Sequence, residues 1–200
     1  MPTPSGRPPR GAPKREAPRS ERAILDAAYH LLVEEGLGAT TVEAIAARAG
    51  VSKVTVYKWW PNRAAVITSA FLSKSGDTLP YPERISRDEV VEALIRMAES
   101  FRGSTGTAIR ALIAEGQVDP DVAQAFRDGY INARREHGTE IIRAAIAEGV
   151  IRDADPDIIL DLLYAPLYFR LVVGHQPLTD EAIRAHVELA LDGLLTPQVK

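Results

Sequence analysis

The chain has 200 residues, 46% of them hydrophobic, and it contains no cysteine. This composition can bury a substantial core, and it excludes a disulfide scaffold and a thiolate metal site. No apolar run approaches the roughly 18 residues of a membrane-spanning helix, and no apolar segment follows the basic N-terminus. We therefore expect no membrane partner and a location in the reducing cytoplasm.

Charge is distributed unequally along the chain. Residues 1–63 carry ten basic and six acidic side chains, a net charge of +4, although the whole chain has a net charge of −3. The remaining residues are therefore clearly acidic. A basic head joined to an acidic body indicates a polyanionic partner at the N-terminal end.

The first segment, residues 1–19, is rich in Pro and Gly and has no large apolar residue except Met1. Such a segment cannot form a core, and we predict a disordered basic arm. Its five basic side chains are Arg7, Arg10, Lys14, Arg15 and Arg19. Two interpretations remain open: a solvated tail, or an arm that contacts nucleic acid.

From Ser20 onward the apolar residues recur with a helical period. Four short helices are predicted, over residues 20–36, 42–49, 52–59 and 63–74. Ser20, either Thr40 or Thr41, and Ser52 are the expected N-caps of the first three, and Gly50 ends the second. Helices this short are not stable alone in water, so they must pack on one another.

The rest of the chain also has helical periodicity and no convincing strand. Five further helices are predicted, over residues 86–101, 108–116, 120–148, 156–173 and 179–195. The predicted fold is all-α, with about nine helices. We expect three parts: the basic arm (1–19), a three-helix DNA-binding head with a helix-turn-helix (20–74), and a larger C-terminal helical bundle (75–200).

The second and third helices have the spacing of a helix-turn-helix. Ala46 allows the helices to approach closely, Gly50 takes the turn conformation, and Val56 faces the core. The second helix of this motif enters the major groove of DNA. The residues left on its outer side are Ser52, Lys53, Thr55, Tyr57 and Lys58.

The segment TTVEAIAARAGVSKVTVYKWWPNRAAVI resembles the DNA-binding segment of the tetracycline-repressor (TetR) family. The likeness covers about residues 21–70 and rests on Thr40-Thr41, Ala46-Ala47, Ala49 to Ser52, Thr55 to Tyr57, and Arg63. APLYFRLVVGHQPLTDEAI resembles one C-terminal subgroup of the same family. The resemblance implies a homodimeric repressor of a pseudo-palindromic operator, with DNA binding relieved by an unknown small-molecule effector in the C-terminal domain.

The resemblance also implies residue roles. Tyr57 and Lys58 stand where relatives contact phosphates, and Thr41 and Arg63 approach the same DNA backbone from two other helices. Trp59 either contacts a phosphate through its indole N–H or only packs, while Trp60 is expected in the core. The predicted DNA-binding residues are Thr40, Thr41, Ser52, Lys53, Thr55, Tyr57, Lys58, Trp59 and Arg63.

The sequence departs from the family pattern at two places. Val54 stands where relatives often have Gly, and Trp59-Trp60 stands where they often have His-Phe. Val54 adds an apolar group that could touch a thymine methyl. The operator sequence therefore cannot be transferred from relatives.

Aromatic side chains on the helices of the body, with a few arginines between them, are typical of a small-molecule pocket in a helical bundle. The predicted pocket residues are Phe101, Phe126, Tyr130, Arg134, Tyr164, Tyr168 and Arg170. The alternative is that these aromatic side chains only fill the core.

The last two helices carry more apolar residues than one inward stripe requires. Ile158, Ile159, Leu162, Leu163, Leu167, Leu171 and Val172 spread over a wide arc, as do Ile183, Val187, Leu191, Leu194 and Leu195. An exposed patch of this size is uncommon on a monomer, so we predict a homodimer in which both helices pack on their two-fold mates. The predicted interface residues are Leu163, Leu167, Leu171, Val187, Leu191 and Leu194.

Enzyme signatures are weak. The four histidines do not have metalloprotease spacing, no serine lies in a nucleophile-elbow pattern, and GSTGT (103–107) lacks the lysine of a phosphate-binding loop. We predict no enzyme, no metal and no cofactor. Two other classes stay open: a helical enzyme or ligand carrier with an incidental helix-turn-helix, and an architectural DNA-binding protein without an effector.

Overall fold

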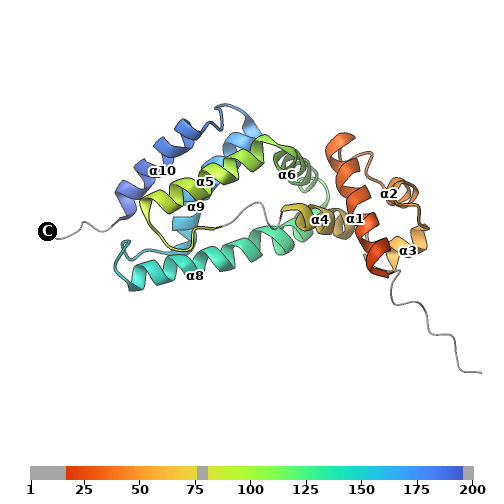
Figure 1. Ribbon diagram of the computed structural model, residues 1–200, viewed down its shortest axis with the longest axis horizontal. Coiled ribbons are helices and arrows are strands. Elements are labelled where there is room, and N and C mark those ends of the chain that lie inside the picture. The colour runs from red at the N-terminus through yellow and green to blue at the C-terminus, as the bar shows by residue number, and fades with distance from the viewer. Residues whose placement is uncertain (1–16, 76–80, 196–200) are drawn as a thin grey trace, which may run out of the picture.

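The computed structural model describes residues 17–75 and 81–195, and these are almost entirely helical (Figure 1). The helices are α1 (Ala17–Glu34), α2 (Val42–Ala49), α3 (Lys53–Tyr57), α4 (Arg63–Ser75), α5 (Arg87–Arg102), α6 (Ser104–Glu115), α7 (Pro120–Phe126), the π-helix η1 (Arg127–Asn132), α8 (Ala133–Ala147), α9 (Pro156–Val173) and α10 (Asp180–Leu194). Within the described ranges the β pairing consists of one isolated bridge between Ile151 and Leu195. The all-α prediction is confirmed.

Local sequence signals set the helix ends in the head. The Thr41 hydroxyl accepts a hydrogen bond from the Ala44 N–H and caps α2, and Ser52 does the same for the Thr55 N–H at the start of α3. Gly50 takes a left-handed conformation, with φ 67°, and so allows the tight turn between the two helices.

The N-terminal end differs from the prediction. α1 begins at Ala17, so Ser20, the expected N-cap, lies inside the helix. Three residues of the predicted arm belong to this first turn, and residues 1–16 lie outside the described part of the chain.

A single glycine joins α5 to α6. Gly103 separates them, and α6 starts at Ser104, so most of the segment between the two predicted helices (86–101 and 108–116) is also helical. A Cβ on Gly106 would lie 1.9 Å from the Phe101 carbonyl oxygen. Only glycine fits at this corner.

The helix expected over residues 120–148 contains a wider turn. α7, η1 and α8 follow one another without a break, but six residues in the middle form a π-helix. At this turn Gly129 packs closely against α4, and a Cβ there would lie 3.1 Å from Leu72 Cδ1 and 3.4 Å from Thr68 Cγ2. Turns of this kind are frequent at functional sites.

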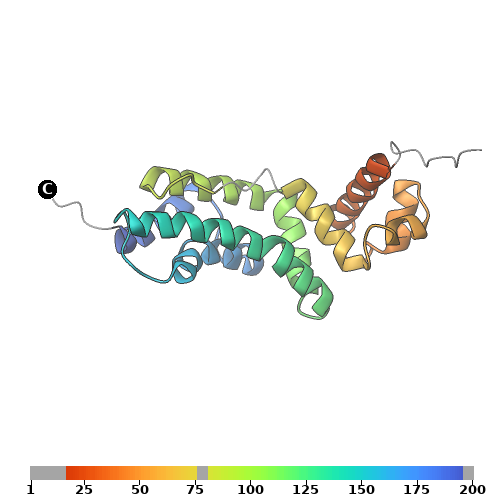
Figure 2. The ribbon, with the colours of Figure 1, turned by 90° about the horizontal axis from the view of Figure 1, so that it is seen from below.

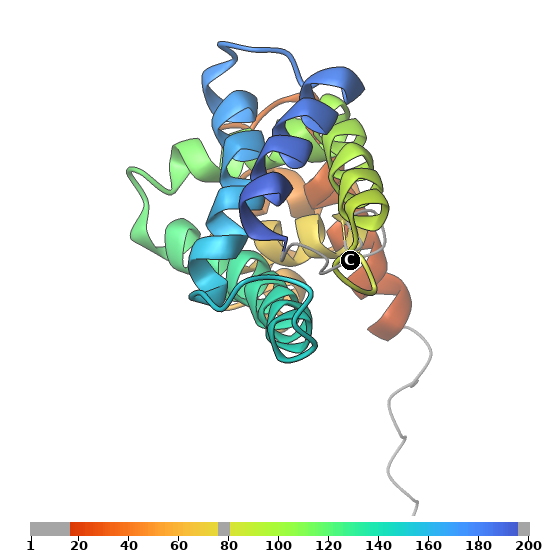
Figure 3. The ribbon, with the colours of Figure 1, turned by 90° about the vertical axis from the view of Figure 1, so that its left-hand side faces the viewer.

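The molecule is elongated. The head helices α1, α2 and α3 lie at one end, and the described chain finishes at the opposite end of the body (Figure 1). α5 and α8 run along the length of the body (Figure 2). Seen end-on, α9 and α10 lie side by side on one flank, with α5 beside α10 and α8 beside α9 (Figure 3).

Head and body share contacts through α4 and α6. α4 packs on α1 on one side and on α7 and η1 on the other, so it belongs to both regions, and the division at residue 74 stays a prediction. The Tyr29 hydroxyl of α1 donates to Ser104 Oγ of α6 at 3.0 Å. No helix within the described residues is long and apolar enough to cross a membrane.

Candidate nucleic-acid interface and small-molecule cavity

The short helix α3 is held by its inner side and its cap. Val56 is buried in the core, where α3 packs on α2, and the Ser52 and Thr55 hydroxyl oxygens lie 2.9 Å apart at the N-terminus. The opposite side carries exposed residues of mixed character: Val54 is 78% exposed and Tyr57 is 53% exposed. These exposed groups make no contribution to the core.

The two lysines of this surface differ in their contacts. Lys53 Nζ donates to Glu43 Oε1 of α2 at 2.8 Å, and this ion pair raises the pKa of the lysine and lowers that of the glutamate. Lys58 has no ion-pair partner among the described residues. Lys58 is therefore free to pair with an external anion, whereas Lys53 must first leave Glu43.

The two threonines before α2 are not equivalent. Thr41 is exposed, whereas Thr40 is fully buried and its hydroxyl donates to the Gly36 carbonyl oxygen at 2.8 Å. Arg63 is also hydrogen-bonded within the chain. Its guanidinium donates to the carbonyl oxygens of Thr40 at 3.1 Å and Leu37 at 2.6 Å, and it lies 3.7 Å from Glu115 of α6.

The two tryptophans separate as expected from the sequence. Trp60 is buried and packs into the head core, whereas Trp59 is 39% exposed at the end of α3. A side chain that is partly covered and partly open can pack on the helix end and still present its indole N–H. Both interpretations of Trp59 therefore remain open.

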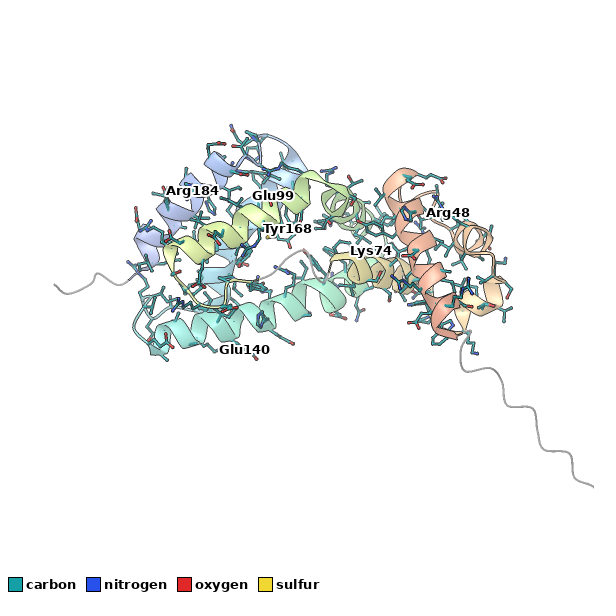
Figure 4. All side chains as sticks on the ribbon, viewed as in Figure 1. Arg48, Lys74, Glu99, Glu140, Tyr168 and Arg184 are labelled. Carbon is teal, nitrogen blue, oxygen red and sulfur yellow. The ribbon has the colours of Figure 1, made fainter. Side chains whose placement is uncertain are left out.

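A cavity of about 170 Å³ lies in the body, mainly between α8 and α9. Its lining comes from Tyr81, Ile131, Arg134, Arg135, Leu160, Asp161, Tyr164, Ala165 and Tyr168. Tyr168 is in the interior of the body, while Arg184 and Glu140 lie at its outer surface (Figure 4). The walls are mostly aromatic and aliphatic, with a few polar groups.

Arg134 is the charged centre of a tyrosine cluster. Its guanidinium lies 4.6 Å from the centre of the Tyr81 ring and 5.7 Å from that of Tyr130, distances typical of cation–π contacts. Burial raises the pKa of Tyr81, Tyr130, Tyr164 and Tyr168, and the charge of Arg134 opposes that rise at each of them. At neutral pH these phenols are therefore protonated hydrogen-bond donors.

At the edge of the cavity Arg135 is bound by two carboxylates. It donates to Asp161 at 2.6 Å and to Asp157 at 2.7 Å. Asp161 and Ala165 are the exposed members of the lining, so the mouth of the cavity lies on this side of α9.

One side of α9 is apolar and exposed, and it is not the side that the sequence predicted as an interface. The predicted interface residues Leu163, Leu167, Leu171, Val187, Leu191 and Leu194 are all buried in the core of the single chain. The exposed residues recur at helical spacing and are Ile158, Leu162, Ala165, Phe169 and Val172. Leu189 of α10 is also 76% exposed.

Two family models match most of the chain. Residues 24–70 match "Bacterial regulatory proteins, tetR family", and residues 86–190 match "Tetracyclin repressor-like, C-terminal domain". The chain belongs to the TetR family of transcriptional regulators. The expected resemblance of both segments is thereby confirmed.

Similar proteins agree with this TetR assignment. The "uncharacterized HTH-type transcriptional regulator YdeS" of Bacillus subtilis is 39% identical over 177 residues, which is 88% of this chain and 89% of YdeS. The crystal structure of the TetR family transcription regulator SCO0332 has 33% identity and a TM-score of 0.75, covering 90% of this chain and all of the other. The "Flavonoid-responsive Regulator FrrA" has 26% identity and a TM-score of 0.67, covering 91% and 100%.

The structure places the predicted pocket residues of this TetR protein in three groups. Arg134, Tyr164 and Tyr168 line the cavity. Phe101, Phe126 and Tyr130 are buried in the core behind it, where Phe101 packs on Tyr168 and Phe126 stacks on Tyr130. Arg170 is elsewhere, with its guanidinium donating to the Pro177 carbonyl oxygen.

Several cavity residues were not predicted from the sequence: Tyr81, Ile131, Arg135, Leu160, Asp161 and Ala165. Tyr81 comes from the connection before α5, and no periodicity signals its approach to α8. The spacing of Asp157 and Asp161, one helical turn apart, is a signal that could have indicated a shared basic partner. Within the described residues no cluster of three His, Asp or Glu side chains could hold a metal.

Proposed function

We propose that this TetR-family protein is a cytoplasmic, one-component repressor that binds a pseudo-palindromic operator as a homodimer and leaves it when a small molecule enters the body. Three features support the proposal: the exposed side of α3, the apolar outer side of α9, and the cavity between α8 and α9. The first of these carries the DNA-binding part of the proposal.

α3 is the element that we assign to the major groove. Its cap and Val56 hold it in place, so Tyr57 and Lys58 are available to donate to phosphates while Val54 meets base edges or a thymine methyl. Thr41 is exposed at the N-terminus of α2 and is assigned to the same DNA backbone. Lys53 joins the interface once it exchanges Glu43 for a phosphate.

Thr40 and Arg63 receive a different role. Both side chains make hydrogen bonds within the protein: the Arg63 guanidinium donates to the carbonyl oxygens of Leu37 and Thr40, just before α2. They hold the N-terminus of α2 in position and connect it to Glu115 in the body. We therefore treat them as residues that position Thr41 and the head, without direct DNA contact.

The outer side of α9 is the proposed dimer interface. Ile158, Leu162, Phe169 and Val172 form one exposed stripe, and such a stripe is an unfavourable surface for a monomer in water. Packing α9 and α10 against their two-fold mates would bury it and would pair the two heads. A paired set of heads matches half-sites one helical turn of DNA apart, or a multiple of that distance.

Contacts between the cavity and α4 supply a route from effector to head. The Tyr168 hydroxyl donates to the Tyr130 hydroxyl at 3.1 Å, and the Tyr130 ring packs edge-on against Phe71 of α4 at 4.9 Å. An effector that moves Tyr168 therefore displaces the helix that carries the head. If it binds better to a dimer whose heads have the wrong spacing, it lowers DNA affinity.

Selection of bound fragments from genomic DNA with the purified full-length protein tests the function. We expect enrichment of fragments that share an inverted repeat, and we expect a gel shift with one of them to be competed weakly by unrelated DNA. Binding that tolerates every sequence would instead support an architectural protein. The absence of DNA binding at low salt would contradict the proposal as a whole.

A further inference from the structure

We propose that the cavity takes a monocyclic aromatic carboxylate, a molecule of the benzoate class. This inference rests on the effector role proposed above, and it names the chemistry of the ligand from the size of the cavity, its walls and its polar groups.

The size of the cavity matches a ligand with one ring. The cavity measures about 170 Å³. An apolar protein cavity of about 150 Å³ holds one benzene molecule. The available space therefore suits a six-membered ring with one small substituent.

The walls favour an aromatic ring over an aliphatic one. Tyr81 and Tyr164 come from different segments, and their ring centres are 5.3 Å apart with the planes inclined by 57°. Tyr168 adds a third ring, and Leu160 and Ile131 complete the apolar surface. Inclined rings at this spacing present both edges and faces to a planar guest, which is the arrangement that aromatic pairs prefer.

The polar groups favour an anion. The positive charge of Arg134 acts on all four tyrosines around the cavity. The Tyr164 hydroxyl has no hydrogen-bond partner among the described residues, and burial keeps it protonated by raising its pKa. A guanidinium and a phenol O–H can both donate to one carboxylate, and hydrogen bonds between charged groups are the stronger kind.

The same groups disfavour a cation. Asp161 is the carboxylate on the lining, and it is already bound to Arg135 at 2.6 Å. A ligand amine would have to displace that guanidinium and would also lie near Arg134. Arg135 is held by both Asp157 and Asp161, so Arg134 is the positive group of the lining that an anion would meet.

Calorimetric titration of the full-length protein, without DNA, tests the inference. The probes are benzoate, benzamide as its neutral analogue of similar shape, and cyclohexanecarboxylate as its non-aromatic analogue. We expect one benzoate to bind per chain, and we expect each analogue to bind at least about tenfold more weakly than benzoate. Equal affinity for benzamide would overturn the anion, and equal affinity for cyclohexanecarboxylate would overturn the aromatic ring. No detectable binding of benzoate would overturn the whole inference.

Two cavity variants and one matched control locate the binding. Arg134→Gln should weaken benzoate by about 10- to 100-fold, the range for a charged hydrogen bond, and leave benzamide almost unchanged. Tyr164→Phe, which removes only the hydroxyl, should weaken benzoate by about three- to tenfold. Arg143→Gln removes an exposed arginine of the same helix and should change neither. Equal effects of Arg134→Gln and Arg143→Gln would contradict a site in this cavity.

Failure of the proposed ligand class can be distinguished from failure of the proposed function. Benzoate that binds but leaves the operator complex intact in a gel shift would support the ligand class and contradict the release of DNA by the effector. A protein that binds its operator as a dimer but does not bind benzoate would keep the DNA-binding function and contradict the ligand class.

Discussion

The head exposes its binding groups, whereas the body encloses them. Tyr57 and Lys58 lie on the outside of a five-residue helix that is held by its cap and by Val56. Tyr168 and Arg134 line an interior space, and each also contacts other side chains of the core. A substitution in the first pair should change binding alone, whereas one in the second changes binding and stability together. Because ligand contacts in the body are also packing contacts, a ligand there can shift the whole structure.

The largest expected effect comes from the surface that joins two bodies. Leu162→Glu combined with Phe169→Glu places charges on the exposed stripe of α9, and we expect helical monomers. DNA affinity should fall by about 100- to 10,000-fold, the gain that two linked sites provide. Sedimentation and gel-shift titration measure the two results.

Val118→Glu is the control for this experiment. Val118 is 79% exposed but lies between α6 and α7, so its substitution should leave the dimer and its DNA affinity intact. A double variant that sediments as a dimer would show that another surface joins the chains.

Two glycines test how tightly each region restrains its backbone. Gly106→Ala in the body brings Cβ against the Phe101 carbonyl oxygen, and we expect a loss of about 3 kcal/mol in the free energy of unfolding. Gly50→Ala in the head meets nothing within 4 Å but requires a left-handed alanine, which costs about 1–2 kcal/mol. Urea unfolding measures both.

Gly38→Ala has open space and no left-handed requirement, and it should change stability by less than about 0.5 kcal/mol. If Gly50→Ala proved more costly than Gly106→Ala, conformational strain would outweigh the close contact, and the body would be the more adaptable region.

Substitutions on the exposed side of α3 should change DNA affinity but not the free energy of unfolding. Tyr57→Phe with Lys58→Ala should weaken binding to all sequences by about tenfold and flatten the salt dependence by about one unit per head, because one of the two lost phosphate contacts is made by a charged group. Gel shifts over a salt series measure this, and Arg96→Ala on the body is the matched control for loss of a charge. Unchanged binding would remove these residues from the interface.

How far the sequence predicts the structure depends on whether a signal is local. Ser52 was correctly predicted as an N-cap, and Thr41 was one of the two expected caps of the second helix, because a cap is made by residues three apart in the chain. The wide turn at Arg127–Asn132 was missed, and there Gly129 packs closely on α4, a contact between distant segments that no local signal reports.

The interface prediction failed for a related reason. α9 is apolar on almost every side, so hydropathy could not tell the core side of Leu167 from the outer side of Phe169. Only the positions of α5, α8 and α10 decide which leucines are covered. The same limit applies to the cavity, because Tyr81 meets Tyr164 across 83 residues of sequence.

The smallest expected effect appears only in alkali, and it concerns the body. Burial raises the pKa of Tyr130, Tyr164 and Tyr168 above the ordinary value of about 10, so the folded state favours the neutral phenol. Below pH about 10 both states keep these protons, and the stabilisation is fully present. Above it the unfolded state ionises first, and stability is lost as the pH rises toward the folded-state pKa values.

Tyr164→Phe removes one of these groups and should make the alkaline decline shallower. Lysines also deprotonate in this pH range, so the useful quantity is the difference in the free energy of unfolding between the wild type and Tyr164→Phe. Urea unfolding measures it at neutral pH and near pH 11. We expect that difference to grow by about 1 kcal/mol, close to the value of one pKa unit for one group. Tyr57→Phe, on the outside of the head, is the matched control. Parallel curves for the wild type and Tyr164→Phe would mean that Tyr164 reaches water readily, and the enclosed cavity would lose its clearest distinction from the open surface of α3.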